Sequence, residues 1–135
     1  MASALYDFGR EGFLAGDIDW DGDNIKLVLI DEADDTIDLA NDQDLADRAA
    51  PSRVATSSNF TTKTVVAGVA DADNVTLSAV SGDQSESLDI YQDSGVEATS
   101  RLIANIDDAT NLPVTPNGGD ITIQFSDGAN KIFKL

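Results

Sequence analysis

The sequence predicts an all-β protein, an antiparallel β-sandwich of about eight strands preceded by a short N-terminal helix. Short segments of alternating apolar residues follow one another along most of the chain, and turn-forming residues separate them. Only the first segment has helical periodicity. Apolar residues make up 41% of the chain but aromatic residues only 6%, so the predicted core consists mainly of aliphatic side chains.

The predicted helix covers residues 3–14. Ser3 can cap it, and Leu5, Phe8 and Gly12 would lie on one face. Together with an acidic turn, this helix makes up residues 1–23. Its glycines weaken an isolated helix, so we expect it to be stabilised by docking.

The strongest early strand is predicted at residues 24–31, where both faces are mostly apolar, as is typical of a central strand. Residues 32–51 are rich in acids and predict a long surface loop with one helical turn. Beyond Pro51, the alternating segments predict strands at residues 53–56, 60–69, 74–80, 86–91 and 101–107.

The last segment, residues 117–135, predicts a β-hairpin. Ile121, Ile123 and Phe125 alternate with polar residues, residues 126–130 have turn composition, and alternation resumes to the end of the sequence. We expect Phe133 and Leu135 to be covered inside a sheet. Without repeats or linkers, residues 1–135 predict a single domain.

The charge balance is strongly acidic, with 25 Asp and Glu against 8 Lys and Arg and a net charge of −17. Such a chain repels phosphate backbones and anionic lipid headgroups, so neither nucleic acid nor a membrane is an expected partner. Residues 1–50 hold 14 of the acids and 3 of the bases. The charge serves solubility or attracts a basic partner surface.

The sequence contains no Cys and no His, which excludes the usual zinc sites and the Ser-His and Cys-His arrangements of many enzymes. No secretion signal and no long apolar run is apparent. We therefore expect a soluble protein that is not an enzyme and that needs no cofactor.

Four acids alternate before the first strand: Asp17, Asp19, Asp21 and Asp23. They resemble the start of an EF-hand calcium loop, but Val28 stands where a bidentate Glu should close the site. The residues are thus a weak calcium candidate, and the alternative is a solvated acidic turn.

Several stretches resemble small virion structural proteins of tailed bacteriophages. They are residues 4–20 (ALYDFGREGFLAGDIDW), 25–30 (IKLVLI), 68–75 (GVADADNV), 90–93 (IYQD), 112–123 (LPVTPNGGDITI) and 130–135 (NKIFKL). The acidic residues 31–50 lie outside the resemblance, and the family brings no catalytic residues.

The resemblance implies a capsid decoration (cement) protein that binds the major capsid protein, forms a homo-oligomer on the shell and stabilises the head. It would be made in the host cytoplasm and reside at the capsid surface. The alternatives are a tail or head-fibre component, and a calcium- or carbohydrate-binding module.

A partner-binding surface is expected near the first helix and the turn after it. The aromatic side chains there have an alternative role, in which they seal or cover the sheet core. The candidate residues are Leu5, Tyr6, Phe8, Arg10, Phe13 and Trp20.

Overall fold

Three buried segments form the centre of a five-stranded antiparallel sheet in the computed structural model, which describes residues 3–135. They are β2 (Ile25–Ile30), β7 (Ser87–Gln92) and β8 (Leu102–Ile106), and nearly all of their residues are buried. Strands β1 (Ala4–Leu5) and β3 (Arg53–Thr56) complete the order β1-β8-β7-β2-β3. The predicted central strand at residues 24–31 is therefore confirmed.

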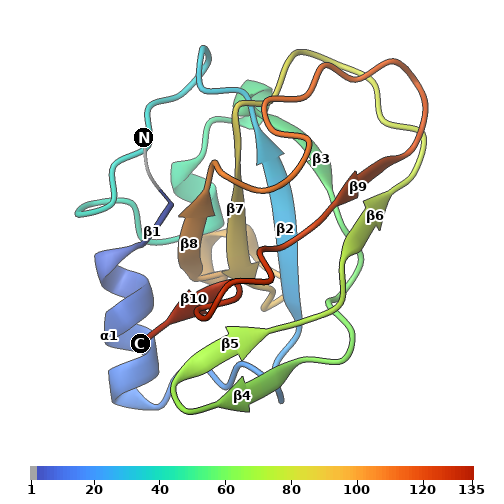
Figure 1. The fold of residues 1–135 in the computed structure, drawn as a ribbon. Coiled ribbons are helices and arrows are strands. Elements are labelled where there is room, and N and C mark those ends of the chain that lie inside the picture. Colours follow the sequence, from blue (N-terminus) through green and yellow to red (C-terminus); the bar gives the residue numbers. More distant parts are fainter. Residues whose placement is uncertain (1–2) are drawn as a thin grey trace.

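A second layer of short strands covers one face of this sheet (Figure 1). Strand β5 (Val69–Asp71) pairs on one side with β4 (Thr64–Val66) and on the other with β10 (Phe133–Lys134). Strands β6 (Val75–Leu77) and β9 (Ile121–Ile123) form a separate pair. The main hydrophobic core contains side chains from both layers. The all-β, sandwich-like class is thus confirmed, with ten short strands among the described residues instead of about eight.

The other face of the large sheet is covered by the acidic segment that follows β2. This segment contains the short 3-10 helices η1 (Leu45–Asp47) and η2 (Ala50–Ser52). Leu45 joins a second apolar cluster that also contains Val28, Ile30 and Tyr6. The prediction of a surface loop is therefore only partly right, because the segment also covers a small core.

The first helix is shorter than predicted. Residues 4 and 5 form β1 instead, and α1 spans Asp7–Ala15. Ser3 does not cap the helix, because its hydroxyl donates to Asp108 Oδ1 at 2.6 Å. Gly9 lies against the backbone of β8, where an added Cβ would come within 2.7 Å of the Ile103 carbonyl oxygen. Among the described residues, no helix is both long and apolar enough to cross a membrane.

The predicted strand at residues 60–69 is wrong in its extent. Two residues with positive φ, Ala67 (52°) and Gly68 (80°), divide it into the hairpin of β4 and β5. Positive φ at both central positions is the geometry of the tight turn that suits the twist of a two-residue hairpin. The Thr and Val content of residues 60–69 predicted a single extended strand, and the turn within it was therefore missed. A third 3-10 helix, η3, spans Glu97–Thr99 in the connection between β7 and β8.

The predicted hairpin at residues 117–135 does not form. Strand β9 pairs with β6, and β10 pairs with β5, so the two expected partners belong to different sheets. Phe133 is buried as expected, whereas Leu135 is 59% exposed. Alternation identified extended segments here but not their pairing, because pairing depends on contacts distant in sequence.

Candidate functional site

The turn after α1 directs its apolar side chains into the protein and its acids into solvent. The helix ends at Gly16, whose φ of 78° lies in the left-handed region that glycine adopts without strain. In the residues that follow, Ile18 and Trp20 are buried, Asp17, Asp19 and Asp21 are exposed, and Asp23 is half-buried. The alternation of acids is therefore the outer side of a segment that packs on the core.

Trp20 fixes this turn against the second layer. Its indole N–H donates to the backbone oxygen of Asp71, on β5, at 3.1 Å. Its ring meets the ring of Phe133 edge-on, with centroids 5.2 Å apart, and Phe133 lies 5.8 Å from the ring of Phe13. Through these ring contacts, α1, the turn and β10 pack against one another and form a continuous aromatic wall.

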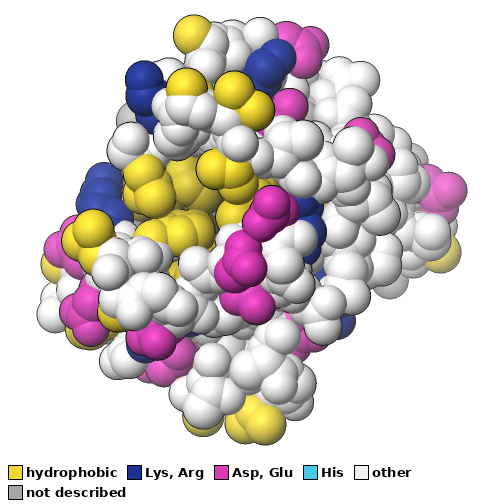
Figure 2. Space-filling view, turned by 90° about the horizontal axis from the view of Figure 1, so that it is seen from below, with side chains coloured by type: hydrophobic (Ala, Val, Ile, Leu, Met, Phe, Trp, Pro, Cys, Tyr) yellow, Lys and Arg dark blue, Asp and Glu magenta, His cyan; other side chains and the backbone are white. Residues whose placement is uncertain are grey.

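An apolar groove opens beside this wall, with a volume of about 510 Å³. Figure 2 shows it as a hollow of hydrophobic side chains, with both acidic and Lys or Arg side chains at its edge. Its volume falls within the range of ligand-binding clefts. The groove is lined by Phe13, Gly16, Ile18, Asp19, Trp20, Asp21, Val65, Gly68, Ala70, Phe133 and Leu135.

Exposed apolar side chains concentrate around the groove. Val65 is 55% exposed and Leu135 is 59% exposed, and both line it. Leu135 also borders a smaller hollow that contains Leu14, which is 89% exposed. Val66, next to Val65 on β4, is 69% exposed. A concentration of exposed apolar side chains is typical of an interaction surface.

The charged groups that line the groove are acidic. Asp19 and Asp21 are both exposed, and no Lys or Arg is among the described lining residues. Lys63, just before β4, donates to the backbone oxygen of Asp23. Arg10 and Lys134 border the smaller hollow on the other side of Leu135. The groove itself therefore favours a ligand with positive charge.

The six sequence-predicted partner residues do not lie together on one surface. Leu5, Tyr6 and Trp20 are buried, and for the two aromatic side chains this agrees with the alternative role in the core. Phe13 is half-buried and lines the groove, and Phe8 is also half-buried. Arg10 is exposed and forms an ion pair with Asp7 at 3.2 Å. No pattern in the sequence marks Val65 or Phe133 as part of a surface, although the turn residues Ala67-Gly68 indicate that Val65 lies in a hairpin.

The four alternating aspartates form a turn stabilised by hydrogen bonds. The backbone N–H of Asp19 donates to Asp23 Oδ2 at 2.8 Å, and Gln92 Nε2 donates to the same oxygen at 2.6 Å. The N–H of Gly22 donates to Asp19 Oδ1. Among the described residues, these aspartates do not form a group of three close carboxylates of the kind that holds a metal ion.

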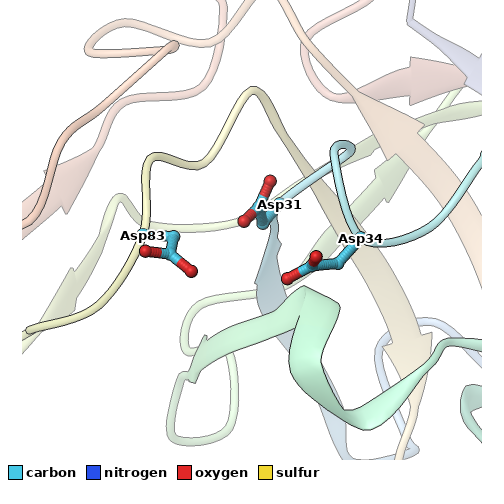
Figure 3. Close-up of side chains that lie close together, drawn as sticks. All are labelled: Asp31, Asp34 and Asp83. Carbon is cyan, nitrogen blue, oxygen red and sulfur yellow. The ribbon is translucent and has the colours of Figure 1, made fainter.

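A different set of carboxylates does converge at the end of β2. One oxygen each of Asp31, Asp34 and Asp83 lies within 4.8 Å of the others (Figure 3). Asp31 is buried and accepts a hydrogen bond from the backbone N–H of Ala33, whereas the other two are exposed. Calcium takes six to eight oxygen ligands, so three carboxylates alone would leave most of its coordination to water.

A buried polar network joins the acidic segment to the large sheet. The Arg48 guanidinium is fully buried, with Nε 3.3 Å from Asp89 Oδ2. Asp89 also accepts hydrogen bonds from the Tyr6 hydroxyl at 2.6 Å and from Asn105 Nδ2 at 3.1 Å. Burial raises the pKa of Asp89 to about 6, because loss of water disfavours the carboxylate more than its neighbours favour it. The pKa of Tyr6 is also raised, by burial and by Asp89.

The groove differs from this network in being open to solvent. Its walls supply apolar contact area and its two aspartates supply negative charge, which are properties of a binding site. No protein-family model matches the chain, and no curated protein matches it in sequence. The interpretation of the groove therefore depends on its own geometry and charge.

Proposed function

We propose that the chain is a non-enzymatic virion structural protein, a capsid decoration protein that binds the major capsid protein and stabilises the phage head shell. The observation that carries this proposal is the apolar groove at one end of an otherwise strongly acidic small β protein. Together with the resemblance of several stretches to small phage virion proteins, it favours attachment to another protein.

The physical properties of the chain suit this role. A net charge of −17 keeps free copies apart before assembly, so that exposed apolar side chains do not cause aggregation. A contact of modest area is sufficient on a shell, because a lattice presents many equivalent sites and oligomers bind several of them together. On this proposal, the protein is a homo-oligomer at the capsid surface.

The test uses particles of the phage whose genome encodes the chain. We expect the chain to be about as abundant as the major capsid protein and to be distributed over the whole head surface. Particles that lack it should lose resistance to heat, and addition of the purified protein should restore that resistance. Quantitative mass spectrometry and particle imaging measure abundance and position, and release of DNA on heating measures stability.

The control for this experiment is an equal amount of another small acidic protein, which should not protect the particles. A low copy number at one vertex or along the tail would contradict decoration and would indicate a head-fibre or tail component instead.

A further inference from the structure

We infer that the apolar groove and the free edge of β4 together bind an extended, basic segment of a partner protein by strand addition. This inference rests on the proposed function for the source of that segment, which is the shell. The chemistry of the bound segment, however, is argued from the groove alone.

The backbone of β4 is available for pairing on one side. In the order β10-β5-β4, strand β4 lies at the edge and pairs with β5 through Thr64, Val65 and Val66. All three of its residues are exposed. An exposed edge strand presents unpaired N–H and C=O groups, which an extended chain can pair with.

Side-chain direction connects this edge to the groove. Successive side chains on a strand point to opposite faces, and Val65 lines the groove. A strand added beside β4 would therefore place alternate side chains over the groove, next to Val65. From Val65 the groove continues across Ala70 on β5 to Phe133 on β10, so the partner needs large apolar side chains to reach into it.

The acidic residues at the groove predict the charge of the partner residues that flank its apolar side chains. Asp19 and Asp21 are exposed at the groove, and no basic residue is among its described lining residues. Lys or Arg side chains flanking the apolar residues of the partner would meet these carboxylates. Two copies joined through this groove would bring Asp19 and Asp21 of both copies together, which disfavours a second copy as the occupant.

The chain offers matched variants for the test. Val65→Lys places a positive charge in the groove, and Val96→Lys makes the same change at a residue that is 58% exposed and does not line the groove. Asp21→Asn removes one groove carboxylate, and Asp127→Asn removes an exposed carboxylate that does not line it. Melting temperatures of all four variants should first be shown to match that of the unsubstituted protein.

The first probe is a synthetic peptide with leucine at alternate positions and lysines at both ends. Its binding is followed by the fluorescence of Trp20, because this is the single tryptophan in the sequence and it lines the groove. We expect Val65→Lys to weaken binding about tenfold or more. Asp21→Asn should weaken it about two- to fivefold, and the two controls should leave it unchanged.

Two results with the peptide would overturn the inference. One is equal binding of a peptide with glutamate in place of lysine, which would show that charge does not select the ligand. The other is equal loss of binding in Val65→Lys and Val96→Lys. Sedimentation of the free protein provides a further check, since a dimer that Val65→Lys dissociates would mean that a second copy occupies the groove.

The second probe is the intact shell, and it separates this inference from the proposed function. Binding of the unsubstituted protein and of Val96→Lys but not of Val65→Lys supports both. Equal binding of all three proteins would support the decoration role but would exclude the groove as the contact with the shell. If the unsubstituted protein does not bind shells, the proposed function fails, and the peptide experiment still decides the chemistry of the groove.

Discussion

Arg48 stabilises the acidic segment on the large sheet through several contacts at once. Its guanidinium forms ion pairs with Asp35 and Asp42 from the segment and with Asp89 from β7. It also donates to the backbone oxygen of Thr36 at 3.1 Å. A fully buried charge is tolerated only when it is paired and hydrogen-bonded, so these contacts hold the segment in one position.

The pH dependence of stability should show the titration of Asp89. Its pKa rises from 3.8 to about 6 on folding, so the folded protein binds this proton more tightly than the unfolded chain does. The stabilising contribution of protonated Asp89 is fully present below pH 3.8 and is lost as the pH rises through 6. Relative to Asp89→Asn, the free energy of unfolding should therefore fall by about 1–3 kcal/mol between pH 4 and pH 7.

Urea unfolding of both proteins at a series of pH values gives this difference. Asp93 has a lowered pKa because Lys26 hydrogen-bonds to its carboxylate, and Asn41 has the same effect on Asp38. These carboxylates stabilise the fold at higher pH and lose that effect on acidification, but they are present in both proteins and cancel. A flat difference across this range would mean that Asp89 does not titrate there.

At the scale of elements, strands that are buried on both faces were predictable from the sequence. Strand β2 is a run of apolar residues, and β7 and β8 carry apolar residues at alternate positions. Both patterns favour a strand whatever its pairing. The predicted strand at residues 86–91 forms as β7, and its Leu88 and Ile90 lie in the main core. Local pattern is sufficient for these elements because burial is their dominant energy term.

Elements whose form depends on distant contacts were not predictable. The pairing of β10 with β5 joins residues more than sixty positions apart, and no local pattern distinguishes it from the expected hairpin. The groove was not predictable for the same reason, because Phe13, Val65 and Phe133 come together only after α1, β4 and β10 have assembled. The burial of Arg48, within the predicted surface loop, likewise depends on acids from two different elements.

At Gly9 in α1, close packing against β8 and helix propensity favour different residues. Gly9→Ala should destabilise the protein by about 1–3 kcal/mol, although alanine is the better helix former by about 1 kcal/mol. The added Cβ would lie 2.7 Å from the backbone oxygen of Ile103, and a backbone atom within β8 cannot move aside cheaply. Chemical denaturation measures the change.

Glu11→Ala is the matched control for this prediction, because Glu11 lies on the exposed side of the same helix. Its effect should stay within about 0.5 kcal/mol of zero. Equal stability of the Gly9→Ala and Glu11→Ala proteins would mean that α1 does not pack as closely on β8 as the structure shows.

At the scale of the whole molecule, the charge of −17 should make stability depend on salt. Raising the ionic strength from about 0.01 M to about 0.1 M shortens the screening length from about 30 Å to about 10 Å. Repulsion among the acids opposes the compact state, so the melting temperature should rise by a few degrees with sodium chloride. Calorimetry at constant pH measures the shift.

The cluster of Asp31, Asp34 and Asp83 sharpens this prediction, because its carboxylate oxygens lie within 4.8 Å of one another. Asp83→Asn should raise the melting temperature at low salt by relieving repulsion on the buried Asp31, and the gain should shrink as salt screens the charges. Asp127→Asn is the control, since Asp127 is exposed and lies outside the cluster. A melting temperature that rises only with calcium at matched ionic strength, and only while Asp83 is present, would instead mean that a bound cation relieves the repulsion.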